Sequence, residues 1–132
     1  MSAHRNADVV RQGFDRFAQG DVAALRDLFA EDATWHIPGA SSMAGTYEGP
    51  DAIIALLRRT AELTGGTYRV DLQWVVADDE HIAAVYRARG NREAGQTLDI
   101  DQALLIKLRE DGLWTDIRAQ PLDQAAFDEF WS

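Results

Sequence analysis

A single amide on an otherwise apolar strand face is the first candidate for chemistry. From residue 98 to residue 108 every even position carries leucine or isoleucine, except Gln102. Side chains alternate between the two faces of a strand, so the even positions are expected to face the core together. A buried amide costs a few kcal/mol unless it is hydrogen-bonded. Two interpretations stay open: backbone or ordered water satisfies Gln102, or Gln102 contacts a bound ligand.

Tyr86 and Arg87 come next, because the strand over residues 81–90 is expected to pair with the strand of Gln102. A hairpin between them predicts Tyr86 on the inner face, near Ile100. It places Arg87 opposite Asp99 on the outer face, although a shift of one residue in the connecting turn would bring Arg87 inward. Neither side chain is a general base near neutral pH. Polarising a carbonyl or holding a water is the role predicted for Gln102 together with Arg87.

A third polar candidate, Thr115, lies on the expected last strand, over residues 113–120. Alternation divides this strand into two faces. The predicted inner face comprises Leu113, Thr115, Ile117 and Ala119. The predicted outer face comprises Trp114, Asp116, Arg118 and Gln120, where Asp116 and Arg118 can pair with charges on neighbouring strands.

The remaining titratable residues do not predict a catalytic or metal site. His4, His36 and His81 are scattered without metal-ligand spacing. The most common role of a lone histidine such as His36 is a surface or hydrogen-bonded one. Asp99 and Asp101 share the outer face of their strand, so a solvated ladder is expected there. No metal and no cofactor are predicted.

Apolar residues are expected to surround the polar groups. Trp35 and Ile37 share one face of a strand over residues 33–37 and are predicted to point inward. Phe14 belongs to the apolar stripe of the first helix. Trp35 is interpreted either as a core tryptophan or as the floor of a pocket. Tyr47, in the loop after the strand, lies either at the pocket mouth or exposed.

The elements that position these residues follow from a change of hydrophobic period. Helical spacing in the first half gives way to alternation in the second half, and short polar connections there predict antiparallel neighbours. Helices are expected over residues 7–19, from Asp21 to Phe29, from Pro50 to Gly65 and after Asp123. Strands are expected over residues 33–37, 68–77, 81–90, 96–108 and 113–120. The pattern predicts an α+β fold.

Composition limits the function classes further. The 132 residues predict one domain, and 22 acidic against 13 basic residues give a net charge of −9. Such a chain repels phosphate backbones and anionic membrane surfaces. Cysteine is absent, which excludes disulfides and thiolate chemistry. Without a signal-like N-terminus or a long apolar run, a soluble cytoplasmic protein is expected.

Two neighbouring segments carry a family resemblance. Residues 29–39 read FAEDATWHIPG and residues 44–53 read AGTYEGPDAI. They resemble the signature region of the SnoaL-like branch of the nuclear transport factor two-like superfamily, and the order of elements matches that superfamily over essentially the whole chain. The resemblance implies a cone-shaped, curved antiparallel sheet wrapped around helices, enclosing one apolar pocket.

The resemblance also implies cofactor-independent chemistry, as in ketosteroid isomerases, limonene epoxide hydrolases and SnoaL-type polyketide cyclases. The acids of those enzymes are replaced here. Ile37 stands before the proline, where the isomerases have their base, and Leu104 stands at their second acid. Trp35 and Ile37 replace a tyrosine and an asparagine of the hydrolases. Ala119 stands where hydrolases and cyclases have a last-strand acid, and only Arg87 has a counterpart in the hydrolases.

These observations predict one domain, over residues 1–132, that binds a small hydrophobic molecule. It is interpreted as an isomerase, cyclase or hydrolase without a cofactor, or alternatively as a non-catalytic carrier, sensor or dimeric partner-binding module. The expected catalytic residues are Gln102 and Arg87. The expected pocket-lining residues are Phe14, Trp35, Ile37, Tyr47, Tyr86, Ile100, Leu104, Thr115 and Ile117. A homodimer is expected through the outer sheet face, where Leu105 and Trp114 are predicted to be exposed.

Overall fold

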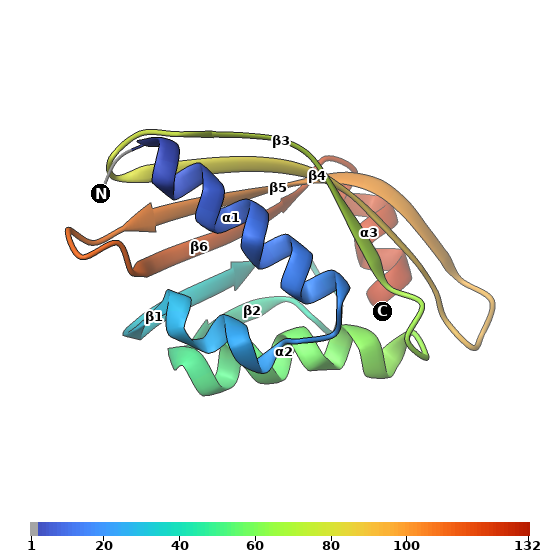
Figure 1. Ribbon diagram of the computed structural model, residues 1–132. Coiled ribbons are helices and arrows are strands. Elements are labelled where there is room, and N and C mark those ends of the chain that lie inside the picture. The colour runs from blue at the N-terminus through green and yellow to red at the C-terminus, as the bar shows by residue number, and fades with distance from the viewer. Residues whose placement is uncertain (1–2) are drawn as a thin grey trace.

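A curved, unclosed sheet of six strands forms the frame of the molecule in the computed structural model, which describes residues 3–132 (Figure 1). The strands lie in the order β2-β1-β6-β5-β4-β3. Their bounds are β1 Phe29–Ile37, β2 Gly45–Glu48, β3 Arg69–Ala77, β4 His81–Asn91, β5 Thr97–Leu108 and β6 Trp114–Pro121. The helices are α1 Ala3–Ala18, α2 Gly49–Leu63 and α3 Gln124–Trp131, with a short 3₁₀ helix, η1, at Ala23–Leu28. The predicted α+β class is confirmed.

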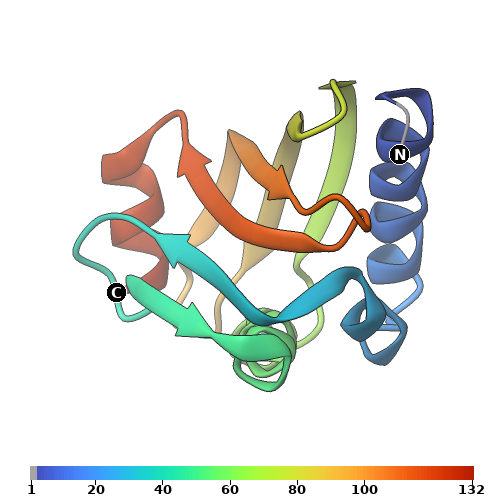
Figure 2. The ribbon, with the colours of Figure 1, turned by 90° about the vertical axis from the view of Figure 1, so that its left-hand side faces the viewer.

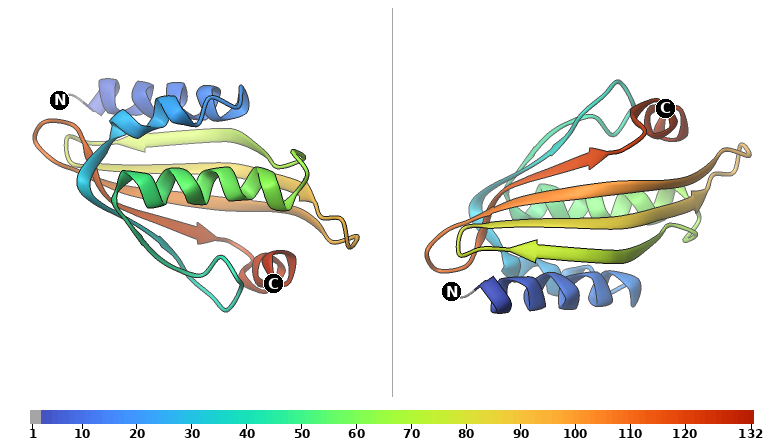
Figure 3. Two further views of the ribbon diagram at one scale, coloured as in Figure 1. Left: turned by 90° about the horizontal axis from the view of Figure 1, so that it is seen from below. Right: turned by 90° about the horizontal axis from the view of Figure 1, so that it is seen from above.

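The helices cover the sheet because its curvature leaves one concave side to fill. Figure 2 shows β3 beside α1, while β1 and β2 turn across to reach α2. Figure 3 shows α2 crossing the face of the sheet and α1 running along the β3 edge. The helix α3 closes the end near the C-terminus and buries Phe127, Phe130 and Trp131. Of the helices within residues 3–132, none is long and apolar enough to span a lipid bilayer.

The segment around β1 differs from the sequence expectation. Residues 23–28 form a 3₁₀ helix, and β1 starts at Phe29, four residues earlier than expected. The cause is tertiary pairing: β1 lies parallel to β6, with Phe29 beside Trp114 and Trp35 beside Ile117. Residues 45–48, expected as loop, form β2 because they pair antiparallel with β1. Pairing with distant strands thus extended the sheet beyond what local spacing indicated.

The β4–β5 hairpin places Tyr86 directly beside Gln102. Arg87 pairs with Asp101, not with Asp99 as expected from the sequence, so the predicted register is wrong by two residues. A shift of two leaves every side chain on its face, because strand side chains alternate with period two. Tyr86 is therefore buried on the inner face, and Arg87 lies on the outer face.

One irregularity in β6 overturns a predicted face. Lys107 pairs with Asp116 but Leu108 pairs with Trp114, so Thr115 is an extra residue in β6. Such a bulge reverses the alternation on one side of it. Trp114, expected on the outer face, is buried, and its ring lies 5.7 Å from that of Phe29. Thr115, expected inward, instead donates a hydrogen bond from its hydroxyl to the Lys107 carbonyl at 3.2 Å. Beyond the bulge, Ile117 and Ala119 are buried as expected.

Candidate ligand-binding cavity

A cavity of about 110 Å³ lies between the concave face of the sheet and the helices. Side chains from opposite ends of the chain meet there, because α1, β1, β4 and β5 all present apolar residues to the same interior. Among the residues expected from the sequence to line it, five do so: Phe14, Trp35, Ile37, Tyr86 and Leu104. The ring of Phe14 packs edge-on against that of Tyr86, with 5.2 Å between the centroids.

The other residues expected at the cavity lie elsewhere. Ile100 and Ile117 are buried but belong to the packed part of the core. Tyr47 does not line the cavity, and its hydroxyl donates to the Met43 carbonyl at 2.8 Å. Thr115 is kept out by the β6 bulge described above. These corrections place the cavity nearer to α1 and η1 than the sequence suggested.

Gln102 is the polar centre of the cavity wall. Its side chain lies between Ile100 and Leu104 on the inner face of β5, and the residue is only 2% exposed. Its Nε2 donates to the hydroxyl oxygen of Tyr86 at 2.9 Å. Its Oε1 is buried and has no hydrogen-bond partner among the described residues. A buried acceptor without a partner costs free energy, so its retention in an apolar wall needs an explanation.

The two cavity tyrosines are neutral acids at physiological pH. Burial raises the pKa of Tyr86 to about 12, although the hydrogen bond from Gln102 acts in the opposite direction. Burial also raises the pKa of Tyr68 well above 10.0, and the nearby Tyr86 adds to that effect. No aspartate, glutamate, lysine, arginine or histidine is among the described residues that line the cavity. The wall therefore offers hydrogen bonds but no general base.

Sequence reasoning missed several lining residues, of which Tyr68 and Trp114 matter most. Tyr68 was detectable in principle, since it precedes Val70 at strand spacing and Val70 also lines the cavity. Trp114 was not detectable by alternation, because the β6 bulge reverses its direction. Ala119 and Leu104, where the resemblance led us to look for enzyme acids, both line the cavity as apolar residues.

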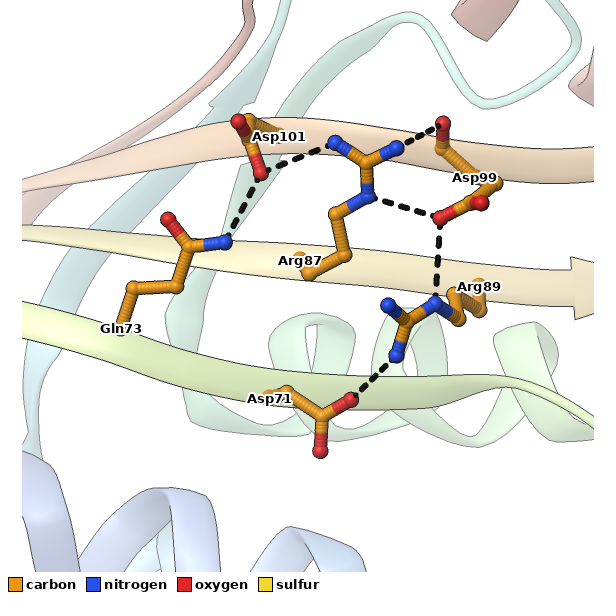
Figure 4. Close-up of polar contacts among 6 residues, drawn as sticks. All are labelled: Asp71, Gln73, Arg87, Arg89, Asp99 and Asp101. Carbon is orange, nitrogen blue, oxygen red and sulfur yellow. Dashed lines mark hydrogen bonds and ion pairs between the residues drawn. The ribbon is translucent and has the colours of Figure 1, made fainter.

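Arg87 lies outside the cavity, contrary to its expected place in the site. Its Nε contacts Asp99 at 2.7 Å and its Nη1 contacts Asp101 at 3.3 Å. These carboxylates hold the pKa of Arg87 above its usual value, and Arg87 in turn lowers the pKa of Asp99. Figure 4 shows the network on the outer face, which comprises Asp71, Gln73, Arg87, Arg89, Asp99 and Asp101. Arg87 stays on the outer face because the β4–β5 register differs from the expected one by two residues, and a shift by an even number preserves the face.

His36 also lies on the outer face, where it is hydrogen-bonded. Its Nε2 lies 3.0 Å from Asp116 Oδ1, and its Nδ1 lies 2.9 Å from the Thr46 hydroxyl. The carboxylate partner comes from the neighbouring parallel strand, 80 positions away in sequence, so the sequence alone did not show it. This contact agrees with the interpretation of His36 as a hydrogen-bonded residue. Within residues 3–132, no cluster of three histidine or acidic side chains could hold a metal ion.

Comparison with known proteins supports the resemblance read from the sequence. Residues 10–117 match the model of the SnoaL-like domain. The chain belongs to the SnoaL-like domain family. The uncharacterized protein Rv0034 of Mycobacterium tuberculosis is 37% identical over 133 residues, with both chains covered completely.

Two solved structures relate this SnoaL-like domain to the wider superfamily. Bal32a, from a soil-derived mobile gene cassette, is 36% identical with a TM-score of 0.92, and 98% of each chain is covered. An NTF2-like protein of Burkholderia xenovorans is 28% identical with a TM-score of 0.82, covering 100% of this chain and 99% of the other. The predicted family and fold are both confirmed.

Proposed function

We propose that this SnoaL-like domain binds a small hydrophobic molecule in its interior cavity. The observation that carries the proposal is the cavity wall, which combines aromatic and aliphatic side chains with the paired Tyr86 and Gln102. Small-molecule sites have this composition, in which apolar walls bind and a few polar groups orient the ligand. The lack of charged lining residues among those described favours a carrier or sensor over an acid–base enzyme.

A second candidate is a cofactor-independent isomerase, cyclase or hydrolase. The observation in its favour is that Tyr86 and Gln102 lie side by side inside an apolar site, where hydrogen bonds polarise a carbonyl more strongly than in water. Arg87 takes no part in this version, since it is engaged on the outer face. A reaction catalysed here would depend on polarisation alone, because Tyr86 stays protonated below a pH of about 12.

Calorimetric titration with toluene tests the binding proposal. We expect saturable binding to the wild-type chain, because its cavity of about 110 Å³ is close to the size that holds one aromatic ring. Ala119→Leu fills the cavity and should abolish binding, whereas Ala103→Leu, on the outer face of the adjacent strand β5, should not. Leu57→Phe provides an independent filling variant. The proposal fails if wild type shows no saturable binding, or if the filling variants bind as well as wild type.

We also propose that two copies pair through the outer face of the sheet. Three large apolar side chains are exposed there: Trp74 at 51%, Val76 at 58% and Leu105 at 44%. Trp74 lies in one row with Val85 and Ala103, and Val76 in the next row with Ala83 and Leu105, so the patch is continuous across β3, β4 and β5. A single patch of this kind can pair with itself about a two-fold axis. Trp114, expected to contribute, does not, because it is buried.

Light scattering on a size-exclusion column tests this pairing. We expect a dimer for wild type and a monomer for Leu105→Asp, because a carboxylate buried within an apolar interface is strongly unfavourable. Lys107→Asp changes the charge two residues further along the same face and serves as the control. A wild-type monomer at micromolar concentration would contradict the proposal.

A cytoplasmic location stays a prediction from the sequence.

A further inference from the structure

The Tyr86–Gln102 pair has hydrogen-bonding capacity that the protein does not use. Gln102 Nε2 donates to the Tyr86 oxygen, and this is the hydrogen bond that joins the two groups. Gln102 Oε1 has no donor among the described residues, and the Tyr86 oxygen accepts in the bond with Gln102, so that bond does not use the Tyr86 hydroxyl proton. Both residues line the cavity, but Oε1 itself has less than 1 Å² of accessible surface, so a ligand would bond to it only after the amide turns toward the cavity.

A hydroxyl group matches this pair in either orientation of the amide. The positions of oxygen and nitrogen in a glutamine side chain are assigned from their partners, so the reversed arrangement must be considered too. In the reversed arrangement Tyr86 donates to Oε1, and the Nε2 hydrogens of Gln102 face the cavity instead. A hydroxyl both donates and accepts, whereas a ketone only accepts and a hydrocarbon does neither. A hydroxyl is therefore complementary in both cases.

The other residues that line the cavity restrict the charge of a ligand. Of the other polar groups that line the cavity, Thr60 already donates to the Leu57 carbonyl at 2.6 Å, and Tyr68 is a neutral phenol. An ionised carboxylate or ammonium buried here would find no opposite charge among the described lining residues, and burial of an unpaired ion is prohibitively costly. The part of a ligand that lies inside the cavity must therefore be uncharged.

The volume of the cavity restricts the size of a ligand. A cavity of about 110 Å³ is somewhat smaller than an apolar cavity of ~150 Å³ that holds benzene. A single six-membered ring with one substituent is near the limit unless the lining side chains move.

We propose that the cavity takes an uncharged molecule of about one ring, carrying one hydroxyl group that bonds to Tyr86 and Gln102 together. This inference rests on the proposed binding function and specifies the chemical class of its ligand. The unpaired amide oxygen of Gln102 is the feature that selects a hydroxyl, because a ligand without a donor leaves that oxygen unsatisfied.

Phenol and toluene are matched probes, since they differ only in a hydroxyl against a methyl group. The ratio of the toluene Kd to the phenol Kd is measured by calorimetry at pH 7 for wild type, Gln102→Leu and Tyr86→Phe. Comparing the ratio between variants cancels the different hydration of the two probes, as in a double-mutant cycle. We expect the ratio to fall about tenfold in either variant, which corresponds to roughly one net hydrogen bond. Ile100→Leu, two residues from Gln102 on the same face but outside the cavity lining, should leave the ratio unchanged.

Each outcome separates this inference from the function on which it rests. If toluene binds to wild type but the ratio is the same in all four proteins, cavity binding stands and the hydroxyl preference is overturned. If benzoate binds as tightly as phenol, the exclusion of charge is overturned. If neither toluene nor phenol binds saturably to wild type, the proposed function fails together with the inference. The use of two variants protects the test against misfolding, because Tyr86→Phe and Gln102→Leu would both have to misfold before the comparison with wild type was lost.

Discussion

Replacing both members of the cavity pair should make the protein more stable. Tyr86→Phe and Gln102→Leu together remove a hydroxyl and an amide from the apolar wall and keep side chains of similar size. In wild type the two groups share one hydrogen bond at 2.9 Å, while Gln102 Oε1 is buried without a partner among the described residues. The wild-type wall therefore combines one favourable contact with one unfavourable burial.

The magnitudes come from these two terms. Loss of the shared hydrogen bond costs about 1 kcal/mol, and removal of an unpaired buried acceptor returns about 1–3 kcal/mol. The double variant should thus be more stable than wild type by about 1 kcal/mol. Tyr86→Phe alone leaves the whole amide unpaired and should destabilise by about 1–2 kcal/mol, while Gln102→Leu alone should stay within about 1 kcal/mol of wild type. If Gln102→Leu alone leaves the stability unchanged, the coupling energy is about 2–3 kcal/mol, near the upper end for residues in contact.

Urea unfolding of the four proteins, followed by tryptophan fluorescence, measures these differences. The free energies are compared at constant m-value, so that a change in midpoint reports stability alone. Leu104→Met, a volume-conserving change on the same wall, is the control and should cost less than about 1.5 kcal/mol. The reasoning is refuted if the double variant is less stable than wild type, since the pair would then be a net contributor to folding with no unmet capacity.

Three further predictions concern the frame around the cavity. Gly39→Ala should lower the melting temperature more than Gly20→Ala, and both glycines have positive φ, +103° and +78°. A Cβ at Gly39 would displace the side-chain ends of Asp128 and Gln124, which are hydrogen-bonded to each other, whereas a Cβ at Gly20 meets open space. Trp114→Ala should destabilise by about 3–5 kcal/mol in urea unfolding, as expected for a buried aromatic residue, and a loss below 1 kcal/mol would argue against its inward orientation. Arg87→Met should lower the free energy of unfolding at pH 7, because the hydrogen bond from Arg87 stabilises the Asp99 carboxylate and lowers its pKa. This stabilisation is fully present above the ordinary pKa of 3.8 and is lost as the pH falls through the lower pKa of Asp99 in the folded state. Urea titrations at decreasing pH should show this difference from wild type shrinking below pH 3.8, and a constant difference would contradict it.

The inner face of β5 shows what the sequence could predict. Strict alternation identified Gln102 as a lone polar residue among buried leucines and isoleucines, and the structure places it there. Tyr86 was also placed on the correct face, even though the turn register was wrong by two residues, because an even shift preserves the face. A face assigned from a period-two pattern is thus preserved by any register error of an even number of residues.

Long-range pairing explains what the sequence could not show. The β1–β6 parallel contact joins segments about 80 residues apart, and nothing in the local pattern of residues 29–32 indicates a strand. The bulge at Thr115 is invisible to any rule of regular alternation, so Trp114 and Thr115 were exchanged between faces. Pairing of His36 with Asp116 and of Arg87 with Asp101 depends on strand neighbours and register, which only the folded sheet defines.

The extra residue in β6 has a consequence for how such interiors diversify. In a strand of regular alternation that kept all its residues, Thr115 would face inward with Ile117 and Ala119, and Trp114 would point away from the core. The bulge absorbs Thr115 and turns the bulky indole inward, while Ile117 and Ala119 keep their places. Loss of Thr115 alone would therefore leave the indole opposite Leu108 on the inner face, so this chamber tolerates a one-residue deletion at the very point where alternation fails.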